Sequence, residues 1–287
     1  IKKVNGVFAA AVYDPEEKSL FLFRDRLGIK PLFYTRADGD FLFASQVCAL
    51  LSWPGVRAEL DEEGLNEVFS IGPARTPGKA VFRNIREVLP GHFLALTPGG
   101  QREIPYWELE SRPHEDSYER TIEKTSFLVE DSVRRQMVSD VPICTFLSGG
   151  VDSSLVSAIC AKELKKQGKR LTTFSFDFVD NDKFFRANSF QPSQDRPYVD
   201  QMVKFLDSDH HYLECGNLTQ ADRLFDSVLA HDLPAMGDID SSMLQFCSMV
   251  KEHNKVALTG ECADEIFGGY PWFHKKECFE AHTFPWT

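Results

Sequence analysis

The spacing of hydrophobic and polar positions changes once along this 287-residue chain. Residues 1–105 consist of short apolar runs separated by turn residues such as Asp-Pro, Asp-Gly and Pro-Gly, which is typical of antiparallel strands. The runs predict hairpins over 7–24 and 32–44, a short helix at Glu62–Phe69 and a strand pair at Glu87–Thr97. We therefore expect an antiparallel sheet assembly in this part.

From Tyr118 onward, segments with helical spacing alternate with short β-rich runs. This order predicts a parallel sheet with helices on its faces, and such sheets bind ligands at the carboxyl ends of their strands. A polar, charged stretch separates these two sequence patterns, so we expect domains at 1–107 and 118–287 with a linker at 108–117. The expected helices are 118–137, 153–166, 198–206, 221–229 and 241–252, and the expected strands are 141–147, 171–178, 211–214 and 255–258.

Composition excludes several classes of protein. The chain is 43% hydrophobic and 26% charged, as in globular proteins, and its net charge of −11 with no basic stretch argues against nucleic-acid and anionic-membrane binding. No apolar run is long enough to span a bilayer. The seven cysteines form no Cys-x-x-Cys pair, which weakens zinc and thioredoxin interpretations and suits a reducing, cytoplasmic location.

Residues Ser148–Ser154, with the sequence SGGVDSS, stand between a predicted strand and a predicted helix. Such a turn directs backbone N–H groups and the positive end of a helix at one point, which suits a phosphate. Asp152 has the wrong charge for phosphate, so it implies a bridging metal ion or a role in orienting the loop. The chain has no Walker A motif, and this loop resembles the pyrophosphate loop of ATP pyrophosphatases. The alternative is an ordinary Gly/Ser turn before a helix.

A second motif, TGECADEIFGGY, follows the last predicted strand at 259–270. Its carboxylates Glu261, Asp264 and Glu265 would repel one another unless a cation or a cationic substrate lies among them. The alternative is a solvated acidic first turn of a helix. Because both motifs follow strands of the same predicted sheet, we expect a Mg²⁺ site with Asp152 and Asp264 as its carboxylate pair.

These two motifs, together with RDRLGIKPLFY (24–34), FAS (43–45) and LPGH (89–92), occur in the order found in glutamine-hydrolysing asparagine synthetases, and the chain resembles that family over nearly its whole length. The resemblance implies an α+β first part, a class II glutaminase of the N-terminal-nucleophile fold with two antiparallel sheets between helices. It implies an α/β second part, a synthetase domain of the ATP pyrophosphatase type.

The resemblance also implies a reaction and its residues. ATP with Mg²⁺ would activate aspartate as β-aspartyl-AMP, and ammonia, free or from glutamine, would then give asparagine; a homodimer is possible in this family. Glu261 matches the glutamate tied to the acyl-adenylate. Asp25 matches an acid that binds the amino group of glutamine, against the alternative of a structural aspartate paired with Arg24 or Arg26. The residues matching ATP and pyrophosphate contacts are Leu147, Ser148, Gly149, Gly150, Asp152, Ser153, Ser154, Phe176, Thr259 and Gly260.

The sequence departs from the family pattern in several places. It starts at Ile1 with no cysteine near the start, whereas the family's glutaminase uses an N-terminal cysteine as nucleophile and base. We therefore expect an internal piece of a longer protein that does not itself hydrolyse glutamine. Gln46 and Cys48 replace residues common after FAS, and the segment Phe184–Gln194 is an insertion, either a substrate loop or a surface excursion. A related ligase acting on another acid, such as a β-lactam synthetase, and a nucleotide-binding protein without catalysis stay open as alternatives.

Overall fold

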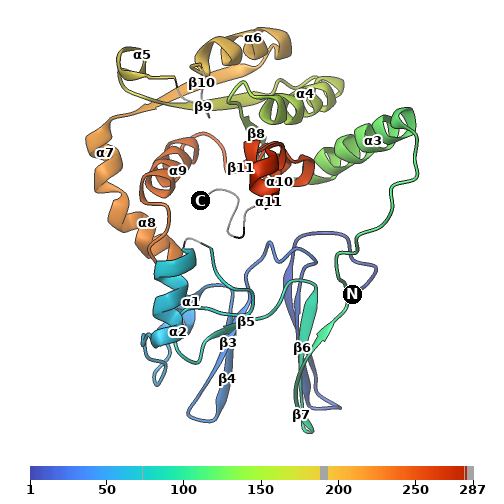
Figure 1. Ribbon diagram of the computed structural model, residues 1–287, viewed down its shortest axis with the longest axis vertical. Coiled ribbons are helices and arrows are strands. Elements are labelled where there is room, and N and C mark those ends of the chain that lie inside the picture. Colours follow the sequence, from blue (N-terminus) through green and yellow to red (C-terminus); the bar gives the residue numbers. More distant parts are fainter. Residues whose placement is uncertain (73, 188–192, 281, 283–287) are drawn as a thin grey trace. The chain divides into compact units, whose positions relative to one another are not determined.

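The computed structural model describes residues 1–72, 74–187, 193–280 and 282 (Figure 1). The chain forms two compact units. The first unit contains residues 1–114 and 224–240, and the second unit contains residues 115–223 and 241–287. The division at residue 114 falls inside the predicted linker. The return of Leu224–Asp240 to the first unit was not expected from the sequence.

The first unit contains two antiparallel sheets, as the apolar runs predict. One has the strand order β1-β2-β6-β7 and the other β4-β3-β5, and both predicted hairpins are confirmed. The predicted helix at 62–69 is instead a short α-helix that continues as a π-helical turn. The elements are β1 Ala9–Asp14, β2 Ser19–Arg24, β3 Phe33–Ala37, β4 Asp40–Ala44, α1 Val47–Leu51, α2 Glu62–Asn66, the π-helical turn Glu67–Ile71, β5 Arg86–Glu87, β6 His92–Thr97, β7 Gly100–Pro105 and α8 Leu224–His231.

The core of the first unit lies between its two sheets. Leu22 on β2 and Leu94 on β6 pack with Leu32, Tyr34 and Val88. The opposite face of β3 packs Phe33 against Val47 and Leu50 of α1. Alternate residues of β3 therefore serve two apolar clusters, which explains why nearly all of this strand is buried.

The second unit is built on a parallel sheet of order β10-β9-β8-β11, which confirms the α/β prediction. The predicted helix 221–229 is wrong as a single element: it is two helices that meet at Arg223 and fall in different units. The elements are α3 Tyr118–Gln136, β8 Ile143–Phe146, α4 Val151–Lys166, β9 Thr172–Phe178, α5 Asn181–Phe184, α6 Arg196–Leu206, β10 Asp209–Cys215, α7 Asn217–Asp222, α9 Gly237–Val250 (begun in the first unit), β11 Val256–Leu258, α10 Ala263–Phe267, the 3₁₀ turn Pro271–Phe273 and α11 Lys276–Glu280.

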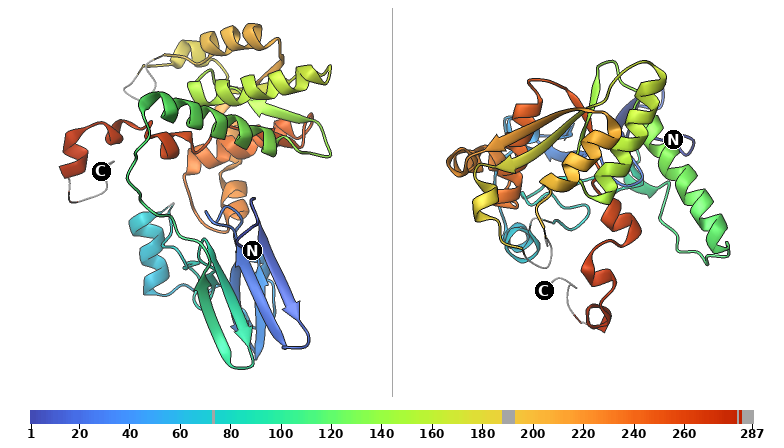
Figure 2. Two further views of the ribbon diagram at one scale, coloured as in Figure 1. Left: turned by 90° about the vertical axis from the view of Figure 1, so that its right-hand side faces the viewer. Right: turned by 90° about the horizontal axis from the view of Figure 1, so that it is seen from above.

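Helices cover both faces of this parallel sheet (Figures 1 and 2). On one face, Val133 of α3 and Ile159 of α4 pack against Ile143 at the start of β8. On the other face, Phe246 and Val250 of α9 pack against Phe174 of β9. Among the described residues, no helix combines the length and the apolar character that crossing a bilayer requires.

Candidate nucleotide site

The loop between β8 and α4 has the strand–turn–helix geometry that its sequence predicts. Gly149 adopts a φ of +82°, which favours glycine, and Gly150 is the N-cap residue of the 16-residue helix α4. The first backbone N–H groups of any α-helix lack intrahelical partners, and in α4 no side chain caps them. Together with the helix dipole, these groups form an anion-binding end.

Hydroxyl groups inside the loop hold it in shape. Ser153 Oγ accepts a hydrogen bond from the N–H of Ser148 at 3.2 Å, lies 2.9 Å from Ser148 Oγ and donates to the carbonyl of Gly150 at 3.3 Å. Ser153 is buried, whereas the Oγ atom of Ser154 is shielded from solvent without a hydrogen-bond partner in the described structure. Ser153 therefore stabilises the loop, and Ser154 keeps an unused hydroxyl group at the same helix end.

Leu147 anchors the loop to the sheet. Its side chain is 1% exposed, its N–H donates to the carbonyl of Phe174 at 2.8 Å, and its own carbonyl accepts a hydrogen bond from Ser175. Phe176 packs against Phe246, with ring centroids 5.4 Å apart, and is partly buried. Both residues lie beside the loop, and the structure gives both of them packing roles.

Gly260 brings the second motif against the first. A Cβ atom added to Gly260 would lie 2.7 Å from the N atom of Ser153 and 2.8 Å from the carbonyl carbon of Asp152. Only a glycine therefore permits this approach of the chain after β11 to the first turn of α4. A Cβ atom added to Gly149 would likewise lie 2.6 Å from the Cβ atom of Tyr198 in α6. The sequence motifs at 148–154 and 259–270 thus meet at the carboxyl ends of β8 and β11, which are neighbours in the sheet.

The acidic motif is held together by contacts that the sequence analysis did not predict. Cys262 adopts a φ of +69° before α10, and the N–H of Gly269 donates to the carbonyl of Asp264 at 3.0 Å. The Tyr270 hydroxyl donates to Glu265 at 2.8 Å. This hydrogen bond, with burial and the charges of Glu265, Asp264 and Glu261, raises the pKa of Tyr270 to about 12. The only signal for Tyr270 in the sequence is its position at the end of the motif.

The two residues expected to hold Mg²⁺ belong to the two segments that meet. Asp152 is in the first turn of α4, next to the contact with Gly260, and Asp264 is in the first turn of α10; both are half-buried. Within the described residues, no group of three or more His, Cys, Asp or Glu side chains forms a metal cluster. Two carboxylates fit Mg²⁺, which takes its other ligands from water and substrate phosphates.

Glu261 and Thr259 lie at the open side of this arrangement. Both are exposed, and the N–H of Glu261 donates to Thr259 Oγ1 at 3.4 Å. The exposed carboxylate of Glu261 is free of ion pairs with any described residue. The insertion Phe184–Gln194 is placed only in part, because residues 188–192 lie outside the described residues.

Asp25 has surroundings of a different kind. It is 2% exposed, and its carboxylate accepts hydrogen bonds from four backbone N–H groups. Its partners are neither of the neighbouring arginines: Arg24 instead pairs with Glu87 at 2.9 Å, and Arg26 donates to backbone carbonyls. The predicted pairing of Asp25 with Arg24 or Arg26 is therefore wrong, because its carboxylate is held by backbone N–H groups instead. The role of Asp25 toward glutamine stays a prediction. The donors to Asp25 are Phe8 at 3.3 Å, Leu27 at 3.2 Å, Ile29 at 3.0 Å and Lys30 at 2.9 Å.

Two cysteines of the second unit are buried core residues. Cys144 in β8 is 0% exposed, as expected of a small core residue, and burial raises the pKa of its thiol to about 12. The same holds for Cys160 in α4. Thiols with such a pKa stay protonated and inert near neutral pH.

Comparison with known protein families agrees with this two-part architecture. The glutamine amidotransferase domain family matches residues 1–107, and the asparagine synthase family matches residues 125–287. The chain thus combines an amidotransferase-type part with a synthase-type part. It belongs to the asparagine synthase family.

Individual relatives extend this result. The chain is 46% identical over its full length to "Asparagine synthetase [glutamine-hydrolyzing] 3" of Bacillus subtilis, of which it covers 46%. It is 29% identical, over 99% of its length, to "Amidase chyE" of Penicillium rubens, of which it covers 43%. It is also 29% identical, over 94% of its length, to "Asparagine synthetase [glutamine-hydrolyzing] 2" of Bacillus subtilis, of which it covers 37%. The chain spans less than half the length of each of these relatives.

Proposed function

We propose that this chain is the nucleotide-binding portion of an ATP-dependent ligase that converts aspartate to asparagine, with ammonia supplied by glutamine. The observation that carries the proposal is the contact of Gly260 with Asp152 and Ser153, because it brings a phosphate-type loop and an acidic motif to one sheet edge. The relatives named asparagine synthetase support the choice of reaction.

In the proposed reaction, an oxygen of the aspartate side-chain carboxylate attacks the α-phosphorus of ATP, and pyrophosphate leaves. Ammonia then attacks the acyl carbon, and AMP leaves with the former carboxylate oxygen. The first N–H groups of α4, with Ser148 and Ser154, would bind the pyrophosphate oxygens. Asp152 and Asp264 would hold Mg²⁺, which supplies charge neutralisation at the phosphates when bound. Phosphoryl transfer requires mainly positioning and electrostatics, and these are what the loop provides.

Glu261 is the residue we propose to act on the aspartyl part of the intermediate. Its carboxylate is exposed and follows directly on Gly260, so it lies next to the loop contact. An acceptor at this position would orient the attacking ammonia by hydrogen bonding. Leu147 and Phe176 would line the adenosine side, and Thr259 and Gly260 would meet the nucleotide through backbone atoms.

The test is product analysis with the complete protein, ATP, MgCl₂, aspartate and either ammonium chloride or glutamine. The proposal expects AMP and pyrophosphate in amounts that depend on aspartate, with asparagine formed in parallel. Formation of ADP, or AMP that does not depend on any acid, would refute it. A second candidate is the same chemistry on another acid, since a relative that matches 99% of this chain is named an amidase and not an asparagine synthetase. AMP formed with a different carboxylic acid but not with aspartate would identify that case.

A further inference from the structure

Asp177 lies near the carboxyl end of β9, the strand next to β8 in the parallel sheet. The two strands are joined where the N–H of Leu147 donates to the carbonyl of Phe174 and where Ser175 donates to the carbonyl of Leu147. The loop at 148–154 leaves the sheet at this level, whereas β9 continues to Phe178. Asp177 follows Ser175 by two residues, so it lies about 7 Å farther along the strand than the start of the loop.

The side chain of Asp177 belongs to the face of the sheet that α4 covers. Thr145 on β8 contacts Ser157 of α4, with 2.8 Å between their Oγ atoms, and Thr145 is paired with Thr173 on β9. Because side chains alternate along a strand, Thr173, Ser175 and Asp177 share this face. The carboxylate of Asp177 is therefore on the same side of the sheet, and at the same edge, as the anion-binding end of α4.

The protein holds one oxygen of this carboxylate and leaves the other open. Oδ1 accepts the N–H of Phe178 and the side-chain amide of Asn181, both at 2.8 Å. Among the described residues, Oδ2 has no hydrogen-bond partner, and Asp177 forms no ion pair. Glu214, directly opposite on β10, pairs with Arg196 at 3.3 Å. Half-buried Asp177 is thus a fixed acceptor with one oxygen available to a donor from outside the chain.

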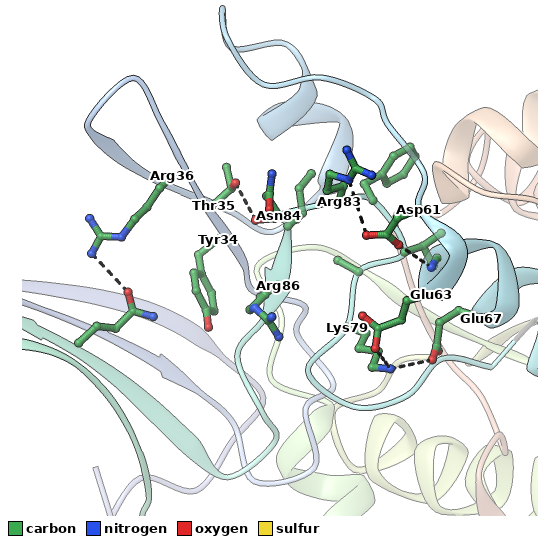
Figure 3. A pocket seen from close by; sticks show the side chains of 16 residues that line it. Tyr34, Thr35, Arg36, Asp61, Glu63, Glu67, Lys79, Arg83, Asn84 and Arg86 are labelled. Atoms are coloured by element: carbon green, nitrogen blue, oxygen red, sulfur yellow. Dashed lines mark hydrogen bonds and ion pairs between the residues drawn. The ribbon is translucent and has the colours of Figure 1, made fainter.

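Acids in a polar pocket of the first unit provide a contrast. This pocket has a volume of about 450 Å³, and Glu63 and Glu67 both pair with Lys79 inside it (Figure 3). Glu67 also accepts the N–H and the hydroxyl group of Thr76, both at 2.7 Å. These two carboxylates are neutralised and hydrogen-bonded by the chain itself, whereas Oδ2 of Asp177 is not.

We propose that Asp177 makes the nucleotide site selective for adenine, by accepting a hydrogen bond from the 6-amino group of the base at Oδ2. This inference rests on the proposed binding of ATP at the loop. In a nucleoside triphosphate bound by its phosphates at α4, the ribose lies nearer to the loop and the base farther away. Asp177 lies beyond the start of the loop and follows directly on Phe176, which we place on the adenosine side.

The chemistry of the carboxylate gives the selectivity its direction. An ionised carboxylate only accepts hydrogen bonds. Adenine has an amino donor at position 6, whereas guanine and hypoxanthine have a carbonyl acceptor there. The same oxygen of Asp177 therefore binds the amino group of ATP and repels the 6-oxo group of GTP or ITP.

The experiment is isothermal titration calorimetry of the complete protein with ATP and with ITP, both in MgCl₂. The wild type should bind ATP at least tenfold more tightly than ITP. In Asp177→Asn, the amide oxygen can keep both hydrogen bonds of Oδ1, so the NH₂ group takes the place of Oδ2 and donates to a 6-oxo group. ATP affinity should weaken about tenfold and ITP affinity should rise, so that the preference for ATP is lost.

Glu214→Gln is the matched control, because it removes the same charge directly opposite Asp177 from an acid that already has a partner. Removing a negative charge near a triphosphate strengthens the binding of both nucleotides, and the ratio of the two affinities cancels that effect. The ratio should be unchanged in E214Q. Unfolding temperatures verify that both variants are folded.

The outcomes separate this inference from the proposed function. If ATP binds but the wild type does not distinguish it from ITP, or if D177N keeps the preference of the wild type, the role of Asp177 is refuted and the nucleotide site stands. If D177N loses affinity for ATP but not for 2′-deoxy-ATP, Asp177 contacts the ribose and the assignment to adenine is wrong. If the wild type binds no nucleoside triphosphate, both the site and the inference fail.

Discussion

Two loops of this chain handle negative charge in opposite ways. In the first unit, the loop after β2 folds around Asp25, and four backbone N–H groups converge on that one buried carboxylate. In the second unit, the loop after β8 leads into α4 without a capping side chain, so its N–H groups point at no anion of the protein. The first loop contains its own anion and is complete, whereas the second needs one from outside. A motif rich in backbone donors is therefore a binding site only when the chain does not supply the acceptor.

The largest effect is expected when the contact between Gly260 and the first turn of α4 is disrupted. Gly260→Ala places a methyl group within 3 Å of backbone atoms of Asp152 and Ser153, and neither can move without shifting α4. Because a displacement of about 1 Å at a reacting centre costs on the order of 100-fold in rate, aspartate-dependent AMP formation should fall by at least that factor.

Gly216→Ala is the matched control, since a Cβ at Gly216 has nothing within 4 Å and its φ is −80°. Its AMP formation should equal that of the wild type. A fully active G260A enzyme would show that the two motifs need not touch.

Asp25→Asn tests the loop that is already complete. The amide keeps one acceptor oxygen but turns an NH₂ group toward two of the four N–H donors, which leaves buried donors unsatisfied. We expect the free energy of unfolding, measured by urea denaturation, to fall by roughly 3 kcal/mol. Asp14→Asn retains its exposed turn hydrogen bonds through one oxygen and should change stability by less than about 0.5 kcal/mol. Unchanged stability in D25N with weakened glutamine binding would instead restore the substrate role predicted from the sequence.

Ser153→Ala removes hydrogen bonds inside the loop at 148–154 without adding any atom that would block its anion-binding end. The variant loses the acceptor of the Ser148 N–H and the hydrogen bond to the Gly150 carbonyl. ATP affinity, measured by calorimetry with MgCl₂, should weaken about tenfold, which corresponds to about 1.4 kcal/mol. Ser248→Ala removes a hydroxyl group that bonds only within its own helix α9, and should leave the affinity as it is. Equal ATP affinities in both variants would mean that the loop does not need this internal bonding.

The smallest effect concerns the sheet that carries the open loop. Burial, and to a lesser extent the neighbouring charges of His211 and Arg196, lowers the pKa of His210 to about 4, against the opposing charges of Asp200 and Asp209. Its Nδ1 atom lies 2.8 Å from Thr173 Oγ1 on β9. Because the folded-state pKa lies below the unfolded value of 6.5, this contribution to stability is complete above pH 6.5 and is lost as the pH falls toward 4.

In His210→Gln, the free energy of unfolding should fall by about 1 kcal/mol less than in the wild type as the pH drops from 6.5 to 4. This value is smaller than the full pKa shift would give, because the ring is only half-buried. The readout is the unfolding temperature between pH 4 and pH 7. If the unfolding temperature falls as much in the variant as in the wild type between pH 7 and pH 4, the pH dependence belongs to other groups.

The sequence predicted the regular elements of both units because their patterns are local. The two hairpins with Asp-Pro and Asp-Gly turns and the alternating helices and strands depend on neighbours in sequence, and they appear where expected. The strand pair predicted at 87–97 is wrong, because β5 pairs with β3 and β6 pairs with β2 and β7 in the other sheet. The break at Arg223 was missed because the apolar spacing of 221–229 continues across it, and only long-range packing separates α7 from α8.

At the site, the two sequence motifs predicted which segments meet but not the contacts through which they meet. The two glycine-containing motifs follow neighbouring strands, so their meeting followed from topology. The converging N–H groups at Asp25 were not predictable, because the carboxylate collects donors from Phe8, 17 residues away, as well as from its own turn. Tyr270 was missed although its partner Glu265 is close in sequence, because nothing about a tyrosine at the end of the motif indicates this hydrogen bond.

The return of Leu224–Asp240 to the first unit has a practical consequence for anyone who wishes to divide this protein. The polypeptide passes from one unit to the other three times, so a protease cut in the connector near residue 114 severs only one of three covalent ties. Gene fragments that end there would leave the amidotransferase-type half without α8. The synthase-type half would still contain residues 224–240, which pack with the other unit. The halves are best studied by inactivating one at a time within an uncut chain.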